Sequence, residues 1–263
     1  MQNKITLGNC LEIMPNIKSE SIDLILCDLP YGTTACKWDT IIPFEPLWKE
    51  YERIIKPNGA IVLTASQPFT SALVMSNPKL FRYEWIWQKN RGSNFALLKY
   101  QPFKEHESVL VFSKNKHKYF PIMQERALSG KNRLKYKVST NCGGDASGFK
   151  VENNHHYFKD PNTLRYPSSI QKFNTEVGLH PTQKPVALFE YIIKTYTNEG
   201  ETVLDNCIGS GTTAIACKRT NRNFIGIEME QKYYDLANWC RRRESNSRPH
   251  PYQGCALPLS HSG

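Results

Sequence analysis

The sequence has no long apolar run, no paired cysteine motif and no secretory leader. Across its 263 residues, no apolar stretch approaches the roughly 18 residues that a membrane-spanning helix needs, so we expect no membrane contact. The opening segment MQNKITLGNC lacks the charged and then apolar layout of a secretory signal, which predicts a cytoplasmic protein. The eight cysteines are scattered, with neither a CxxC pair nor a Cys/His cluster at zinc spacing, so we expect reduced, buried thiols and no metal site.

Acidic residues are scarce in one part of this basic chain. The formal net charge is +10, and residues 114–178 hold twelve Lys and Arg against five Asp and Glu, a surplus of seven. A solvated, lysine-rich surface loop would have this composition, and so would a phosphate-binding surface beside a catalytic site. Hydrophobic periodicity also fades across this stretch, which predicts an inserted, loop-rich region.

Outside that stretch, strand-like and helix-like patterns alternate along the chain. Helical spacing is seen in PFEPLWKEYERII, which a Pro-Asn-Gly sequence ends, in PFTSALVMSN, in KPVALFEYIIKTYTNEG and from Thr212 to Thr220. Short apolar strands are expected at residues 4–8, 22–28, 60–66, 83–90, 107–114, 201–205 and 223–229. This alternation predicts an α/β fold with a mostly parallel sheet, in which ligands bind beyond the carboxyl ends of the strands.

The segment VLDNCIGSGTTA is an apolar strand that runs through Asp205 into a glycine loop and then a helix. Gly209 and Gly211 allow a tight turn close to a ligand, and Glu228 lies nineteen residues beyond Gly209 at the end of the next strand. A carboxylate there can accept two hydrogen bonds from a ribose diol. The loop lacks the Gly-Lys-Ser/Thr of a phosphate-binding loop, which argues against an NTPase. The pattern predicts nucleoside binding; an NAD enzyme stays open, although no hydride-transfer constellation is evident.

A second strand ends in Asp28, Leu29, Pro30 and Tyr31. An acid and a backbone carbonyl that converge on one exocyclic amine can accept both of its hydrogens, which favours a pyramidal nitrogen with its lone pair pointing outward. The proline restricts the turn, and the ring of Tyr31 offers a face on which an extruded base can stack. The same four residues would also suit an ordinary turn after a strand.

Taken together, these motifs resemble those of the amino-methylating DNA methyltransferases, in the permuted group whose catalytic motif precedes the methyl-donor motif. DLPYG is similar to the family's D-P-P-Y, and LDNCIGSGTT to its S-adenosylmethionine loop. HPTQKP, GIEME and LGNCLEIM resemble three further elements around the cofactor. The resemblance covers residues 5–113 and 179–239, and the basic stretch 114–178 falls where this group inserts its target-recognition region.

The resemblance implies a Rossmann-like methyltransferase fold, with a twisted sheet covered by helices on both faces and S-adenosylmethionine as the methyl donor. It assigns the target amine to Asp28 and the Leu29 carbonyl, in a turn shaped by Pro30, and base stacking to Tyr31. It assigns the cofactor to Asn9, Cys10, Thr182, Lys184, Asp205, Gly209, Gly211, Thr212 and Glu228. Leu29 replaces the family's first proline, which implies a looser turn with the same chemistry, because the family uses the carbonyl of that residue. Asn9 replaces an Asp, which leaves the contact with the adenine of the cofactor open.

We therefore expect a catalytic half at residues 1–113, a target-recognition insert at 114–178, a cofactor-binding half at 179–239 and a poorly ordered tail at 240–263. The predicted activity is site-specific methylation of adenine N6 in double-stranded DNA, by base flipping and direct in-line attack without a metal. Asp rather than Ser at position 28 favours adenine over cytosine. Cytosine-N4 methylation, an RNA or protein-amide methyltransferase of the same fold, and a nonenzymatic nucleic-acid-binding protein stay open. So do a partner restriction endonuclease and a homodimer.

Overall fold

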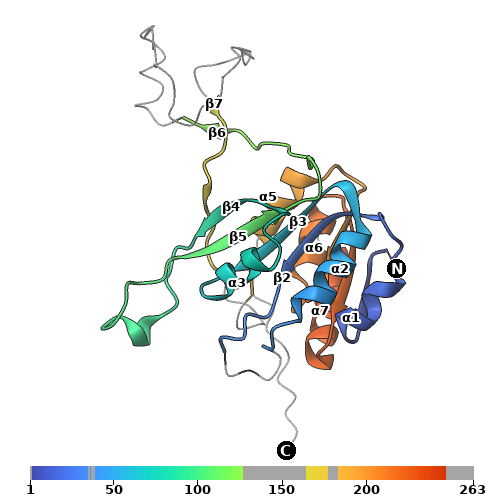
Figure 1. The fold of residues 1–263 in the computed structure, drawn as a ribbon, viewed down its shortest axis with the longest axis horizontal. Coiled ribbons are helices and arrows are strands. Elements are labelled where there is room, and N and C mark those ends of the chain that lie inside the picture. The colour runs from blue at the N-terminus through green and yellow to red at the C-terminus, as the bar shows by residue number, and fades with distance from the viewer. Residues whose placement is uncertain (1, 35, 37–38, 127–163, 177–182, 247–263) are drawn as a thin grey trace, which may run out of the picture. The chain divides into compact units, whose positions relative to one another are not determined.

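A computed structural model of the protein describes residues 2–34, 36, 39–126, 164–176 and 183–246 (Figure 1). The chain divides into a main unit, residues 1–120 with 169–263, and a small unit, residues 121–168. The small unit is narrower than the predicted insert 114–178, because the residues on either side of it belong to the main unit. In its described part, β6 (Gln124–Glu125) pairs with β7 (Leu164–Arg165) in an antiparallel ladder.

An eight-stranded sheet forms the centre of the main unit, in the order β1-β10-β9-β2-β3-β5-β4-β8. Only β5 runs antiparallel to its neighbours among these described strands, so the sheet is mostly parallel, as predicted. The strands are β1 (Lys4–Leu7), β2 (Ile22–Asp28), β3 (Ile55–Ala65), β4 (Phe81–Gln88), β5 (His106–Phe112), β8 (Ile170–Lys172), β9 (Thr202–Asp205) and β10 (Asn223–Glu228).

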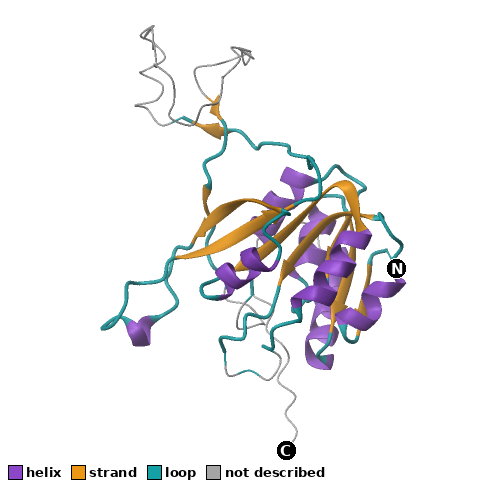
Figure 2. Cartoon of the chain, in the orientation of Figure 1, coloured by secondary structure: helices purple, strands orange, loops and turns teal. Residues whose placement is uncertain are grey.

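Helices cover both faces of the sheet, which confirms the layered α/β prediction (Figure 2). One face carries α1 (Cys10–Ile13), α2 (Phe44–Ile54) and α3 (Phe69–Ser76), and the other carries α5 (Val186–Tyr196), α6 (Thr212–Arg219) and α7 (Gln231–Asn246). In β2, Leu24 and Leu26 pack into one core cluster, whereas Ile25 and Cys27 pack into the other. A strand buried on both faces is mostly apolar, which explains the hydrophobic run from Leu24 to Cys27.

The second helix ends earlier than its sequence pattern predicts. Helix α2 stops at Ile54, and Pro-Asn-Gly lies inside β3 instead of ending the helix. The register between β2 and β3 jumps from Ile22↔Ile55 to Leu24↔Ala60, so the intervening residues of β3 bulge outward. A Cβ on Gly59 would lie 2.8 Å from the carbonyl oxygen of Asp23, and glycine is therefore required where the bulge returns to the ladder.

The last helix ends later than predicted. Helix α7 continues to Asn246, although we expected an end near Cys240 and a poorly ordered tail beyond it. Two hydrogen bonds anchor the helix past Cys240: Lys218 Nζ donates to the carbonyl of Arg241 at 2.7 Å, and Arg241 Nη1 donates to the carbonyl of Asn3 at 2.9 Å. Residues 247–263 of the expected tail lie outside the described residues.

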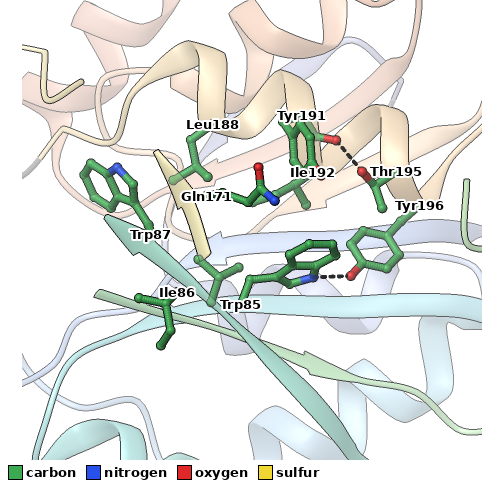
Figure 3. Close-up of a pocket in the computed structure, with 10 residues that line it drawn as sticks. Trp85, Ile86, Trp87, Gln171, Leu188, Tyr191, Ile192, Thr195 and Tyr196 are labelled. Carbon is green, nitrogen blue, oxygen red and sulfur yellow. Dashed lines mark hydrogen bonds between the residues drawn. The ribbon is translucent and has the colours of Figure 1, made fainter. Parts of the chain in front are cut away.

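Strands β4 and β8 and helix α5 enclose a small apolar pocket (Figure 3). Trp85 and Trp87 are buried in its wall, as their alternating positions in the strand pattern predict. Trp85 Nε1 donates to the hydroxyl of Tyr196 at 2.6 Å, and Trp87 Nε1 donates to the carbonyl of Phe173 at 2.8 Å. The Trp85 contact fixes α5 against the sheet, and the Trp87 contact fixes the residue that follows β8.

The cysteines in the described ranges are free thiols, and four of them are buried, as predicted: Cys10, Cys27, Cys217 and Cys240. Over the same ranges, no group of three or more His, Cys, Asp or Glu side chains is placed to hold a metal ion. None of the helices that the structure describes combines the length and the apolar character that crossing a membrane requires.

Candidate active site

The sheet brings the two predicted motifs to one edge. Strands β2 and β9 are parallel neighbours, with Leu24 opposite Val203 and Ile25 opposite Leu204. Strand β2 ends at Asp28 and β9 ends at Asp205, so both acids stand at the carboxyl edge of adjacent strands. Strand β10, on the other side of β9, ends there with Glu228. This is the edge at which open α/β sheets bind their ligands.

Both carboxylate oxygens of Asp28 accept hydrogen bonds from side chains. Oδ1 accepts the hydroxyl of Tyr31 at 2.7 Å and the hydroxyl of Thr64, and Oδ2 accepts from Lys184 Nζ at 2.6 Å. The Tyr31 ring stacks on Phe69, with centroids 5.1 Å apart. Burial, followed by the charge of Asp28, raises the pKa of Tyr31 well above its ordinary value. Tyr31 is therefore a protonated donor at neutral pH, and it holds the carboxylate in one orientation.

Lys184 connects Asp28 to a chain of alternating charges. Its Nζ lies 3.4 Å from Glu107 Oε2, and Glu107 also pairs with Lys89 through Oε1. Burial alone would lower the pKa of Lys184, but the charges of Asp28 and Glu107 raise it above its ordinary value. Burial alone would raise the pKa of Glu107, but Lys184 and Lys89 lower it. Lys184 and Glu107 therefore keep their charges in the middle of this chain, because neighbours of opposite sign offset the cost of burial.

This contact places Lys184 differently from the sequence prediction. We assigned it to the cofactor, whereas its side chain reaches Asp28 and only its backbone carbonyl, 3.4 Å from the Thr212 hydroxyl, touches the glycine-loop helix. Glu107 and Thr64 were not predicted as site residues. The available signal for Glu107 was a carboxylate at the start of the buried strand HESVLVF, where a charge needs a partner.

The glycine loop and Glu228 contact one another directly. Glu228 Oε2 accepts from the backbone nitrogen of Gly209 at 2.8 Å, and Oε1 accepts from the nitrogen of Glu230 at 2.9 Å. Burial raises the pKa of Glu228. Gly211 has a φ of 91°, and a Cβ there would lie 3.2 Å from Ala237, so α6 can begin at this position only with glycine.

Asp205 lies at the start of this loop and is almost completely buried. Oδ1 accepts from the nitrogen of Cys207 at 3.1 Å, and Oδ2 accepts the hydroxyl of Thr213. Burial raises the pKa of Asp205 to about 7, despite these hydrogen bonds. Its protonation therefore changes near neutral pH, next to the loop.

The first helix begins at the same edge, because Leu7 in β1 lies opposite Glu228. Asn9 caps α1 by accepting from the nitrogen of Leu11 at 3.0 Å, and Cys10 is buried behind it. A hydrogen bond from Cys207 lowers the pKa of Cys10 to about 7. Burial raises the pKa of Cys27 to about 12, so this thiol, next to Asp28, is protonated at neutral pH and is no nucleophile.

The turn after Tyr31 is organised by an acid that the sequence did not single out for this role. Asp39 accepts from the backbone nitrogens of Gly32 and Thr33 at 2.9 Å each, and of Thr34 at 2.7 Å. Burial would raise the pKa of Asp39, but these hydrogen bonds lower it. Thr182, which we also predicted as a cofactor residue, lies outside the described residues.

The acidic hydrogen-bond acceptors around the glycine loop suit a cationic nucleoside. Residues 205–213 contain no Lys or Arg, and the acids at this edge, Asp205 and Glu228, can accept from ribose hydroxyls or face a positive charge. A phosphate would instead need cations or a phosphate-binding loop. The residues present therefore fit the S-adenosylmethionine that the resemblance implies.

Comparisons with known proteins identify the family of this chain. The model of a family described as DNA methylase, of the N6/N4 methyltransferase type, matches residues 22–239. Type II methyltransferase M.HpaI of Haemophilus parainfluenzae is 29% identical over 250 residues, which cover 90% of this chain and 73% of that protein. Type II methyltransferase M1.MboII of Moraxella bovis is 28% identical over 261 residues, covering 90% and 95%. The crystal structure of the M1.HpyAVI-SAM complex is 27% identical, with a TM-score of 0.59 over 90% of this chain and 98% of that one.

Proposed function

We propose that this protein methylates adenine N6 at a specific site in double-stranded DNA. The proposal starts from the family: the chain belongs to the N6/N4 DNA methylases and is an S-adenosylmethionine-dependent DNA methyltransferase. The observation that carries the proposal is the position of Asp28. Its carboxylate stands at the tip of β2 beside the glycine loop of β9, with the Tyr31 ring next to it. Asp rather than Ser at this position supports adenine over cytosine.

In this proposal, Asp28 and the carbonyl of Leu29 accept the two hydrogens of the target amine. Asp28 Oδ1 already accepts the hydroxyls of Tyr31 and Thr64, so the amine takes the place of one of them. Release of Tyr31 frees its ring to stack on the extruded base. Lys184 remains on Oδ2 and keeps the carboxylate directed at the amine. These contacts direct the nitrogen lone pair away from the ring of the base.

The cofactor, when bound, supplies an electrophilic methyl group on a sulfonium. Glu228 would accept its ribose hydroxyls, and Asp205, Gly209 and Thr212 would hold the remainder against the loop, with Asn9 and Cys10 beside them. Because these residues and Asp28 occupy one edge of the sheet, the donor and acceptor are held together. Such positioning can account for roughly 7–11 kcal/mol of a barrier.

The target base has to leave the duplex before it can reach Asp28, at a cost of about a few kcal/mol. We assign target recognition to the basic stretch 114–178, whose surplus of seven positive charges favours contact with phosphates. The type II designation of the relatives supports a role in restriction–modification, in which a nuclease of the same specificity would be the counterpart.

Nucleoside analysis tests the proposal. The purified protein is incubated with S-adenosylmethionine carrying an isotope-labelled methyl group and with duplex DNA or, separately, RNA, and the digested nucleosides are identified by mass spectrometry. We expect labelled N6-methyladenine from the duplex only, formed about 1,000-fold more slowly with Asp28→Ala. Labelled N4-methylcytosine would favour the alternative target, and label in RNA alone would contradict a DNA substrate. Sequencing of DNA from expressing cells then gives the recognition sequence.

A further inference from the structure

The loop between β4 and β5 exposes large apolar side chains to solvent. We call residues 91–104 the β4–β5 loop; it projects from the sheet in Figure 1. Tyr100 is 84% exposed and Phe95 is 68% exposed, and Leu97, Leu98 and Phe103 are also exposed. A local group of exposed apolar residues on a soluble protein marks a surface that contacts a partner.

Contacts within the loop fix its shape. Asn94 Nδ2 donates to the carbonyl of Pro102 at 2.9 Å, and the nitrogen of Lys104 donates to Asn94 Oδ1 at 2.8 Å. The rings of Phe95 and Phe103 meet edge to face, with centroids 4.9 Å apart. A Cβ on Gly92 would lie 2.5 Å from the Phe103 ring, so glycine permits this packing. The loop therefore has a defined conformation in which Tyr100 is exposed to solvent.

The charge of the loop favours a polyanionic partner. It contains Arg91, Lys99 and Lys104 and no acidic residue, and the net charge of all residues between β4 and β5 is likewise +3, because Lys89 and Glu105 at its two ends cancel. Aromatic rings interleaved with cations are the combination that binds nucleic acids, since rings stack on bases and cations pair with phosphates. A purely apolar protein partner would not require the cations.

The loop leaves the sheet at the edge that carries Asp28. Asp28 lies opposite Thr64 in β3, and Thr64 lies opposite Val109 in β5, whereas the loop joins β4 to β5 at the pair Gln88↔His106. Val109 and His106 are three residues apart, so the loop begins about 10 Å beyond the level of Asp28. DNA that delivers a base to Asp28 would therefore pass within reach of the loop.

We propose that the β4–β5 loop inserts Tyr100 into the DNA duplex beside the target base and fills the space that the extruded base leaves. The proposal rests on the proposed function of the site. A ring wedged between base steps unstacks them locally, and a filled gap opposes return of the base. Lys99 and Arg91 pair with the flanking phosphates. This surface is additional to the basic stretch 114–178.

The test compares Tyr100→Ala with Tyr100→Phe and with Met75→Ala, a control at an apolar residue of α3 that is 72% exposed. Two duplexes carry the modified sequence found in cells, one fully paired and one with a mismatch opposite the target base. We expect Tyr100→Ala to lower kcat/KM about 30-fold on the paired duplex and less than about 3-fold on the mismatched one, because an unpaired base is already easier to extrude. Tyr100→Phe recovers most of the rate, and Met75→Ala matches the unsubstituted protein.

Equal rates of Tyr100→Ala and the unsubstituted protein on paired DNA, or equal losses on both duplexes, would overturn the insertion. Analytical ultracentrifugation covers the alternative occupant: dissociation of a dimer by Tyr100→Ala would mean that the loop binds a second copy of the chain. A separate arm measures binding to a fluorescent 30-base-pair duplex. If the unsubstituted protein methylates no DNA, the proposed function fails. Independently of methyl transfer, unchanged binding of this duplex by Tyr100→Ala would refute the insertion of Tyr100.

Discussion

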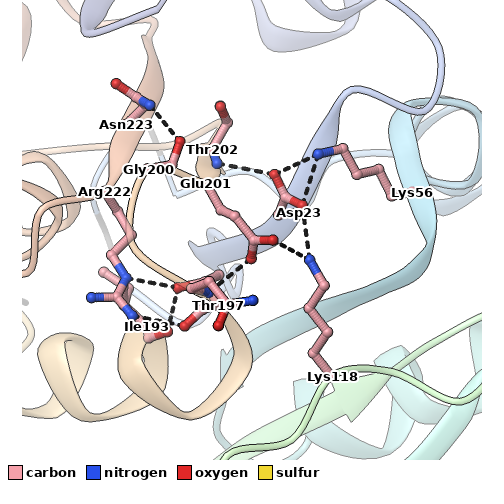
Figure 4. Close-up of polar contacts among 11 residues, drawn as sticks. Asp23, Lys56, Lys118, Ile193, Thr197, Gly200, Glu201, Thr202, Arg222 and Asn223 are labelled. Atoms are coloured by element: carbon pink, nitrogen blue, oxygen red, sulfur yellow. Dashed lines mark hydrogen bonds and ion pairs between the residues drawn. The ribbon is translucent and has the colours of Figure 1, made fainter.

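The two ends of strand β2 each carry an aspartate paired with a lysine, but only one of them lies at the candidate site. At the amino end, both oxygens of Asp23 accept from Lys56 Nζ at 2.8 Å (Figure 4). At the carboxyl end, Asp28 accepts from Lys184 at 2.6 Å. The Asp23 side chain is 2% exposed and the Asp28 side chain is 22% exposed. The chemical pair is the same, and its surroundings differ.

The partners of the two acids explain the difference. Asp23 also accepts from Lys118 at 3.2 Å and from the backbone nitrogen of Thr202 at 3.1 Å, and Lys118 in turn pairs with Glu201 (Figure 4). A backbone donor in the neighbouring strand β9 cannot move away, so this end is closed by the fold. The other partners of Asp28 are two hydroxyls, which can give way to a ligand. An aspartate paired with a lysine can therefore bind a ligand only where its other hydrogen-bond donors can be displaced.

The largest effect that we expect separates the two ends by activity. Asp28→Ala should lower the rate of methyl transfer about 1,000-fold, because the carboxylate that orients the amine is lost. Affinity for S-adenosylmethionine should stay within a few-fold, since the proposed partner of Asp28 is the target amine and not the cofactor. The protein should stay folded, since Glu107 still pairs with Lys184. A tritiated-methyl assay and titration calorimetry measure the two quantities. Full activity of this variant would remove Asp28 from the mechanism.

Replacement of the two lysines should give an unequal result. Lys184→Met leaves the half-buried Asp28 and Glu107 without their shared cation, so we expect about a 100-fold loss of rate and about 3 kcal/mol less unfolding free energy. Lys56→Met should cost less than about 1 kcal/mol, because Lys56 is partly exposed and Lys118 still pairs with Asp23. Steady-state kinetics and urea unfolding measure both.

A second substitution separates positioning by Lys184 from stability. Glu107→Gln in the Lys184→Met background restores the balance of buried charge, so stability should recover while the rate stays low. If the rate recovers together with stability, Lys184 has only a structural role, as Lys56 does, and the two lysines do not differ in function.

Asp23→Ala should reverse the result of Asp28→Ala. Removal of Asp23 leaves Lys118 and the backbone nitrogen of Thr202 without this acceptor in a buried region, and we expect a loss of about 3 kcal/mol in unfolding free energy. The rate per folded molecule should remain near that of the unsubstituted protein, because Asp23 lies at the opposite edge from the site. Urea unfolding with activity measured on the folded fraction provides both values. A loss of rate larger than the unfolded fraction explains would show that Asp23 influences methyl transfer from the opposite end of β2.

The smallest expected effect is a difference in pH dependence between the two edges. Burial would raise the pKa of Asp23, but Lys56, Thr202 and Lys118 lower it, so its stabilising contribution is present above about pH 4 and is lost as the pH falls through the lowered pKa. The pKa of Asp205 is raised from 3.8 to about 7, so its contribution is full below about pH 4 and is lost as the pH rises through about 7. Stability measured by urea unfolding from pH 3 to 8 should therefore lose its neutral-range decline in Asp205→Asn and its acid-range decline in Asp23→Asn. An unchanged curve in Asp205→Asn would contradict a raised pKa.

The sequence by itself determined the parts of the site that are written in consecutive residues. The apolar run of β2 and the acid that follows it, and the glycine loop with Glu228 nineteen residues beyond Gly209, were all predicted and meet at one edge. Such features can be read from a chain because a strand, its end and the next turn are local, and parallel strands end at the same edge.

Only the tertiary structure decided which polar groups are joined across the sheet. Lys184 reaches Asp28 across 156 residues, and Asp23 reaches the backbone of Thr202 across 179. The sequence offered Lys184 as a cofactor residue and did not indicate that Asp23 and Asp28 each have a lysine partner. Partners of this kind depend on strand order and on register, such as the shift between Ile22 and Leu24. Hydrophobic periodicity specifies which face of an element is buried, but it does not specify which charged side chains meet at the strand ends.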